Sequence, residues 1–219
     1  MRIAFLNRGR ETHPGGDIIA LDATMEALRK RGHICVETGW HADRIKDFDI
    51  AHMFHCNFDW SWGNYQAMAK AGKPYVLTPV FYPGPLLAGI SLAQLGEIVT
   101  QAEYVLPFSS TERDMMSFRT EFRVIPNGTG IGFCLPTLKT QSVVCVSARG
   151  DSDKGIPMLR SICKRIGVPL HIATNVPRAE LPTMYRSKVF VNASSSERMS
   201  LTIGEALCSG CRVLATQEN

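Results

Sequence analysis

Residues 2–32 read RIAFLNRGRETHPGGDIIALDATMEALRKRG and contain a strand, a loop and a helix in succession. The run 2–7 is short and almost continuously apolar, as in a parallel strand that is covered on both faces. The segment 17–31 has apolar residues at helical spacing, and Gly32 is a natural helix stop. These apolar residues are Ile18, Leu21, Met25 and Leu28. The pattern predicts the start of an α/β sheet.

The alternation of strand and helix continues in two separate runs. In the first run we expect strands at 2–7, 33–38, 50–55, 74–79, 104–108 and 123–125, and helices at 17–31, 60–71, 91–102 and 111–118. A turn-rich segment follows at 129–141. The second run predicts strands at 143–147, 169–173, 189–193 and 212–215, and helices at 155–166, 179–185 and 200–208. We therefore expect two doubly wound α/β domains, residues 1–135 and a shorter domain of residues 136–219.

Composition limits the classes of function. Of the 219 residues, 45% are apolar and 20% are charged, as in an ordinary globular protein. The net charge of +4 comes from scattered cations, so we expect no nucleic-acid partner; a phosphorylated small molecule or an anionic membrane surface suits it better. No apolar run is long enough to span a membrane, and the seven cysteines are typical of reduced thiols. These features predict a cytoplasmic protein, with membrane contact only at the periphery.

Two loops have residues that suit a phosphate group. Arg149 follows the strand at 143–147, and Lys154 precedes the next helix, so both cations would reach the edge of the sheet where parallel strands end. In the first run, Gly15 and Gly16 precede a helix, where backbone amides can bind an anion. The alternative hypotheses are that Lys154 is merely solvated, and that the loop before Gly15 and Gly16 is simply flexible, with Asp17 as the N-cap of the helix.

Two carboxylates, Glu197 and Glu205, lie on either side of a predicted helix start. Carboxylates accept hydrogen bonds from vicinal hydroxyls, so this pair could hold a ribose and a hexose with a diphosphate between them. The alternative is that Glu197 caps the helix and Glu205 is a surface acid. Cys208 and Cys211 form a C-x-x-C pattern, but no second pair supplies the other ligands of a zinc site.

Five motifs in one order resemble family 4 of the retaining glycosyltransferases. The order is what makes the resemblance specific, because each motif alone is weak. They are Pro14-Gly15-Gly16 with Leu21, Leu28 and Arg31-Gly32-His33; Val124-Ile125-Pro126-Asn127-Gly128; Arg149; Lys154-Gly155; and Glu197 with Glu205-Ala206-Leu207-Cys208-Ser209-Gly210.

The resemblance implies a GT-B fold, with an acceptor domain facing a donor domain across a cleft. Such enzymes move a hexose from a nucleoside-diphosphate sugar, of the GDP-mannose or UDP-glucose type, to a hydroxyl acceptor without a metal. By position, Arg149 and Lys154 would bind the diphosphate, Glu197 the hexose and Glu205 the ribose, with Arg149, Lys154 and Glu197 serving catalysis. The amides of Met199, Ser200, Leu201 and Thr202 would face the donor, and Gly15 and Gly16 would close over it.

The chain departs from the family pattern in two ways. Many members have a histidine after the fourth strand, whereas the segment 78–82 contains no ionisable residue that could replace it; His13, His52 and His55 are the alternatives. The chain is also shorter than most members, so a second copy could cover its second domain as a homodimer. Two other functions stay open: a non-catalytic sugar-nucleotide binder or partner subunit, and a metal-dependent GT-A enzyme that uses Asp151 and Asp153.

Overall fold

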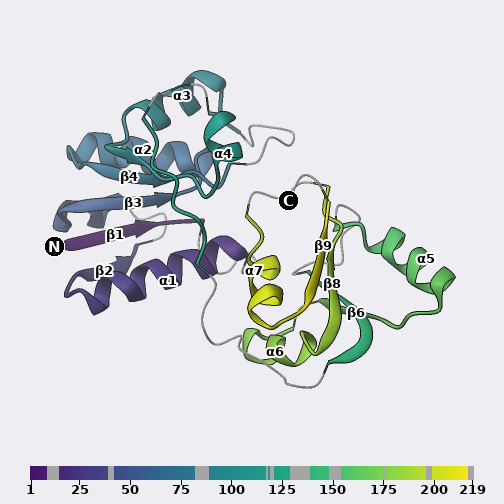
Figure 1. Cartoon of the computed structure of the whole chain (residues 1–219). Coiled ribbons are helices and arrows are strands. Elements are labelled where there is room, and N and C mark those ends of the chain that lie inside the picture. Colours follow the sequence, from purple (N-terminus) through teal and green to yellow (C-terminus); the bar gives the residue numbers. More distant parts are fainter. Residues whose placement is uncertain are drawn as a thin grey trace. The chain divides into compact units, whose positions relative to one another are not determined.

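The computed structural model divides the chain into two compact units, Met1–Asn127 and Gly128–Asn219. The structure describes residues 1–8, 15–38, 42–81, 89–116, 118, 121–128, 139–147, 154–174, 176–195 and 199–216. Each unit contains one parallel β-sheet with helices packed on it (Figure 1). Within the described ranges no helix is sufficiently long and apolar to cross a membrane.

The first unit contains a five-stranded sheet of order β2-β1-β3-β4-β5. Every neighbouring pair of its strands is parallel. Its strands are β1 (Arg2–Leu6), β2 (Ile34–Glu37), β3 (Ile50–Phe54), β4 (Tyr75–Thr78) and β5 (Tyr104–Val105). Its helices are α1 (Gly16–Lys30), the 3-10 helix η1 (Ala42–Asp47), α2 (Asp59–Ala71), α3 (Leu92–Thr100) and α4 (Ser110–Asp114).

Alternating side chains of β1 divide the first core into two layers. Ala4 and Leu6 lie in one cluster with buried residues of α2 and α3. Ile3 and Phe5 lie in the other, against Leu21 of α1. Figure 1 shows α1 on one face of the sheet, with α2 and α3 on the opposite face. Successive side chains of a strand point to opposite faces, so a strand covered on both sides must be apolar throughout.

The second unit repeats this arrangement on a smaller scale. Its strands are β6 (Thr140–Ser147), β7 (Leu170–Thr174), β8 (Ser187–Asn192) and β9 (Arg212–Ala215), in the order β7-β6-β8-β9. Its helices are α5 (Ile156–Ile166), η4 (Arg178–Glu180), α6 (Leu181–Met184) and α7 (Leu201–Cys208). Val144 packs with α6 and α7 on one face, and Cys145 packs with α5 on the other. The predicted pair of doubly wound α/β sheets is confirmed.

Several predicted elements differ from the structure. Strand β5 ends at Val105, three residues before the predicted end, and β6 begins three residues before its predicted start. Residues 123–125 form no strand, although Arg123 and Ile125 each donate one backbone hydrogen bond to the β5 side of the sheet. The helix expected at 179–185 is divided into η4 and the four residues of α6. Pro182 lies at the start of α6; because proline restricts the preceding residue and lacks an N–H, a continuous helix is disfavoured. Helix α4 ends at Asp114, earlier than expected.

Candidate functional site

In the second unit, β6 and β8 are parallel neighbours in the sheet. Lys154 precedes α5, and Ser194 follows β8. The Lys154 ammonium group donates a hydrogen bond to the Ser194 hydroxyl at 3.3 Å. This contact joins the start of the α5 segment to the loop before α7.

Gly155 permits this contact by its lack of a side chain. Its φ is 66°, in the left-handed region that favours glycine. A Cβ at this position would lie 2.5 Å from the carbonyl oxygen of Ala193 and 2.7 Å from the Ala193 Cβ. The turn of Lys154 and Gly155 therefore packs directly on the backbone that follows β8, at a distance that only glycine allows.

A chain of hydrogen bonds continues from Ser194 to the first turn of α7. The Ser194 amide donates to Oδ1 of Asn192 at 3.0 Å, and Nδ2 of Asn192 donates to the Ser200 hydroxyl at 3.1 Å. The hydroxyls of Ser200 and Thr202 lie 2.9 Å apart. Three predicted donor-binding residues, Lys154, Ser200 and Thr202, are thus members of one polar network.

Glu205 is buried in α7, with 1% of its surface exposed. Its Oε2 accepts a hydrogen bond from the hydroxyl of Tyr185 at 2.8 Å. The alternative that Glu205 is a surface acid is wrong, because α7 places the Glu205 carboxylate inside the unit, against the hydroxyl of Tyr185. A buried carboxylate needs such donors to offset the loss of water.

Several predicted site residues lie outside the part of the chain that the structure describes. Arg149 and Glu197 do so, and so do the D-x-D residues Asp151 and Asp153. Of the remaining donor-binding candidates, Met199 is 38% exposed and Leu201 is 8% exposed. Met199 precedes α7 and Leu201 begins it. The role predicted for their backbone amides in donor binding stays a prediction.

In the first unit, Gly15 and Gly16 begin α1, with Gly15 as the N-cap residue. A Cβ on Gly15 would lie 2.5 Å from Oδ1 of Asp17 and 2.9 Å from a guanidinium nitrogen of Arg8. Gly15 therefore leaves room for an ion pair. The alternative that Asp17 is the N-cap of this helix is wrong, because Asp17 is the second helical residue and its side chain contacts Arg8 and His55.

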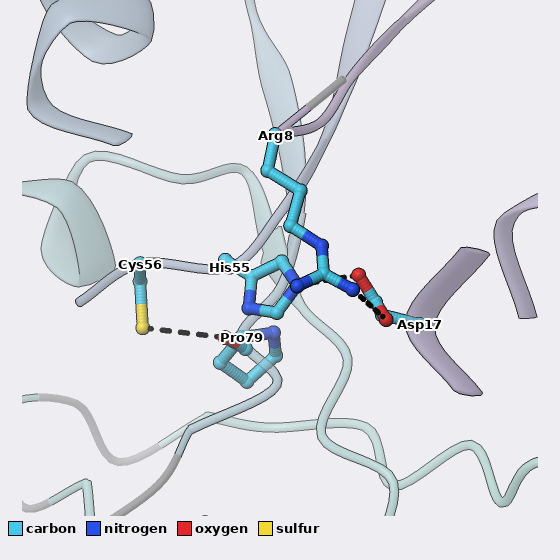
Figure 2. Close-up of polar contacts among 5 residues, drawn as sticks. All are labelled: Arg8, Asp17, His55, Cys56 and Pro79. Carbon is cyan, nitrogen blue, oxygen red and sulfur yellow. Dashed lines mark hydrogen bonds and ion pairs between the residues drawn. The ribbon is translucent and has the colours of Figure 1, made fainter. Parts of the chain in front are cut away.

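Asp17 joins Arg8 and His55 in a buried cluster at the edge of the first sheet (Figure 2). Arg8 donates to Oδ1 of Asp17 at 2.9 Å, and Nε2 of His55 lies 3.0 Å from Oδ2. The side chains of Asp17 and His55 are each only 7% exposed. Burial acts to raise the pKa of the Asp17 carboxyl, but the hydrogen bond from His55 and the charge of Arg8 outweigh burial and lower that pKa.

The other two histidine alternatives differ from His55 in position. His52 lies inside β3, where burial lowers its pKa to about 4, and its Nε2 lies 2.8 Å from the Thr78 hydroxyl. A neutral core histidine of this kind is structural. His13 lies outside the described residues.

An ionisable group does approach the turn after β4, although the sequence of that turn contains none. Glu112 of α4 is fully buried, and its two carboxylate oxygens accept the backbone N–H groups of Phe81 and Phe108, each at 2.6 Å. In the same region the Cys56 thiol donates to the carbonyl oxygen of Pro79 at 3.6 Å (Figure 2). Burial, reinforced by the charge of Glu112, raises the pKa of this thiol well above its usual value. Glu112 therefore fixes the turn, and Cys56 is not activated.

The two cysteines of the C-x-x-C pattern are free thiols in different environments. Cys208 is exposed, whereas Cys211 is buried and its thiol donates to backbone carbonyl oxygens of Tyr185 and Ser187. Among the residues that the structure describes, no group of three or more His, Cys, Asp or Glu side chains could hold a metal ion.

The two sheets and their strand orders define the GT-B fold, and comparison with solved structures confirms it. No protein-family model matches the sequence, and no curated protein matches it. Sucrose-phosphate synthase from Thermosynechococcus elongatus is similar with a TM-score of 0.77 and 15% identity, covering 99% of this chain and 81% of the synthase. These values establish the shared fold.

Two further structures with bound sugar nucleotides have the same architecture. Anabaena HepE in complex with UDP-glucose has a TM-score of 0.73 at 15% identity, covering 99% of this chain and 80% of HepE. The E. coli trehalose-6-phosphate structure bound with UDP-2-fluoro glucose has a TM-score of 0.66 at 10% identity, covering 99% and 84%. The GT-B prediction is confirmed, and a GT-A architecture is excluded.

Proposed function

We propose that this protein is a retaining hexosyltransferase that uses a nucleoside-diphosphate hexose, with UDP-glucose as the first candidate donor and GDP-mannose as the second. The contact between Lys154 and Ser194 carries the proposal. A cation held at the meeting point of two strand ends, beside a network that leads into a helix start, has the chemistry of a diphosphate site. The UDP-glucose bound by HepE supports the choice of donor.

The donor would be bound mainly by residues of the second unit. Lys154 and Arg149 would neutralise the diphosphate, and the backbone amides at 199–202 would add hydrogen bonds at the start of α7. Glu205 would bind the ribose and Glu197 the hexose. The network from Ser194 to Ser200 favours this arrangement because it holds the loop against α7 before a ligand enters.

The proposed chemistry is an exchange of one bond for another at the anomeric carbon. The bond from that carbon to the phosphate oxygen breaks, the acceptor oxygen bonds to the carbon on the same face, and the acceptor proton passes to the leaving phosphate. Negative charge grows on the diphosphate as it leaves, so Lys154 and Arg149 would stabilise the transition state more than the ground state. No metal is needed for this step.

The experiment is a binding and hydrolysis screen over UDP-glucose and GDP-mannose in the presence of EDTA. We expect Lys154→Ala to weaken donor binding about 30- to 150-fold, the equivalent of about 2–3 kcal/mol for a charged hydrogen bond. Lys164→Ala is the matched control, since Lys164 lies exposed in the last turn of the same helix. Equal donor affinities for the wild type and Lys154→Ala would refute the diphosphate site.

Turnover separates the transferase from a non-catalytic binder or partner subunit. A transferase should hydrolyse its donor slowly without metal, and Lys154→Ala should lower that rate. Tight donor binding with no hydrolysis and no transfer would favour the binder. The same assay tests metal independence, because EDTA would abolish turnover by a metal-dependent enzyme.

A further inference from the structure

His55 adopts a backbone conformation that residues other than glycine rarely adopt. It directly follows β3 and has a φ of 69°. Its ring lies edge-on to Phe58 and to Trp60, with centroids 5.5 Å away in both cases, and Asp17 holds one ring nitrogen. Unfavourable backbone conformations persist only where surrounding contacts maintain them, and they gather at functional sites. The orientation of the His55 ring is therefore closely constrained.

The contact with Asp17 assigns the proton on the His55 ring. The Asp17 carboxylate is ionised near neutral pH and is held by Arg8 at 2.9 Å, so it can only accept hydrogen bonds. Nε2 of His55, 3.0 Å from Oδ2, therefore carries the proton (Figure 2). In the neutral ring the other nitrogen, Nδ1, is then an acceptor. A carboxylate orients the catalytic histidine of hydrolytic triads in the same way.

This acceptor belongs to a group of buried polar atoms at one edge of the first sheet. Among the described residues, no group donates to Nδ1 of His55. The same holds for the amide of Asn7, which follows β1, and for Oδ1 of Asn57, two residues after His55. Buried polar atoms are nearly always hydrogen-bonded, so several such atoms at one sheet edge mark a place where a further polar group binds.

We propose that Nδ1 of His55 accepts a hydrogen bond from a hydroxyl group of a hexose, with Asp17 as the positioning residue that fixes the tautomer. The proposal rests on the proposed function, which supplies a hexose as a candidate acceptor sugar. The cluster's charges favour a hydroxyl over a phosphate group: Arg8 is engaged with Asp17, and a nitrogen lone pair repels an anion. The Asn7 amide, which can donate and accept, would bind a second hydroxyl.

Two substitutions test the roles of the two ring nitrogens of His55 separately. In His55→Gln the amide nitrogen occupies roughly the place of Nε2, so the variant keeps a donor for Asp17 but loses the acceptor at Nδ1. In His55→Asn the amide oxygen can stand near Nδ1, and Asn tolerates a positive φ. His33→Gln, at a half-buried position before β2, controls for a general effect of replacing a histidine.

The readout is the ¹⁵N spectrum of the histidine rings in the intact protein, with His55 assigned from the His55→Gln variant. We expect the tautomer protonated at Nε2 in the free protein, and a shift of the Nδ1 resonance on adding a sugar probe. A shift with methyl α-glucoside identifies an acceptor sugar as the source of the hydroxyl. A shift with UDP-glucose, but not with the glucoside, would contradict an acceptor sugar as the source.

Affinity for the active probe gives the second measurement. We expect His55→Gln to weaken sugar binding about tenfold and His55→Asn to weaken it by less than about threefold. Asp17→Asn should move the proton to Nδ1 and abolish the shift. A proton on Nδ1 in the wild type, an equal response to inorganic phosphate, or unchanged sugar affinity in His55→Gln would each overturn the proposal.

The result of the His55 experiments can be distinguished from the result of the Lys154 experiments. Donor binding that depends on Lys154, combined with a His55 ring that responds to no sugar, would overturn this inference and leave the proposed function intact. A response to methyl α-glucoside in a protein that binds no nucleotide sugar would overturn the proposed function and retain a hydroxyl-binding site at His55.

Discussion

Gly155→Ala tests whether the position of Lys154 depends on a missing side chain. With φ at 66°, an alanine here costs about 1–2 kcal/mol from backbone strain alone. Its Cβ would also lie 2.5 Å from the Ala193 carbonyl oxygen, a backbone atom that cannot rotate away. Relieving that overlap requires the turn to shift, at a further cost of about 1–3 kcal/mol. We expect the free energy of unfolding to fall by about 2–5 kcal/mol.

Gly167→Ala is the matched control at the other end of α5. Gly167 has a φ of 67°, and a Cβ built on it would meet no atom of a more distant residue within 4 Å in the described part of the chain. In this variant the free energy of unfolding should fall only by the cost of backbone strain, about 1–2 kcal/mol. Urea unfolding of both variants isolates the contact with Ala193, and titration with UDP-glucose measures the donor site. Only Gly155→Ala should weaken binding, because only this substitution moves Lys154 relative to Ser194.

A third variant separates the two atoms of Ala193 that Gly155 approaches. Adding Ala193→Gly to Gly155→Ala removes the Cβ contact at 2.7 Å but keeps the carbonyl oxygen, so it should restore only part of the lost stability. Equal destabilisation by Gly155→Ala and Gly167→Ala, with donor affinity unchanged in both, would refute the argument that close packing on Ala193 positions the cation.

Three other predictions concern buried polar groups. Burial lowers the pKa of His52 to about 4 from 6.5, so the neutral ring favours the folded state. The stability that it contributes is present above pH 6.5 and is lost as the pH falls towards 4. Urea unfolding between pH 4 and 7 should therefore show about 3 kcal/mol less acid destabilisation in His52→Gln than in the wild type, and parallel curves would contradict this. Glu112→Gln should lower the free energy of unfolding by about 2–3 kcal/mol at pH 7, because one of two backbone N–H groups then faces an amide NH₂; an unchanged melting temperature would contradict it. Tyr185→Phe should cost about 1–2 kcal/mol, because it removes a donor from the buried Glu205, whereas Tyr65→Phe, whose partner carboxylate is exposed, should cost less in the same thermal assay.

The fold could be predicted because the pattern of apolar residues in the sequence indicates which faces of each strand are buried. The strand predicted at 2–7 is β1, and the strand predicted at 212–215 is β9 with the same bounds. The pattern was wrong at 123–125, where an extended apolar segment lies beside β5 without forming a ladder. Extended backbone and a paired strand have the same local sequence preferences, so only the partner distinguishes them.

The candidate site was less predictable because its contacts join distant parts of the chain. Lys154 was found from its place before a helix, but its partner is 40 residues away. Asp17 was considered only as a possible helix cap, and its contact with His55 spans 38 residues. One signal could have placed Arg8 near His55, since each follows one of two strands, β1 and β3, that a doubly wound sheet brings together.

The two sheet edges share a topology and differ in charge, which indicates different ligands. In the first unit, Asp17 lies in the first turn of α1 and neutralises the positive end of that helix, so an anion is disfavoured beside Gly15 and Gly16. In the second unit, the first turn of α7 has no acidic residue, and Lys154 lies in the network that leads to it. We therefore expect the diphosphate to bind at α7 rather than at α1. At the edge beside Asp17 we expect a neutral hydroxyl group, which could donate to the unpaired Nδ1 of His55.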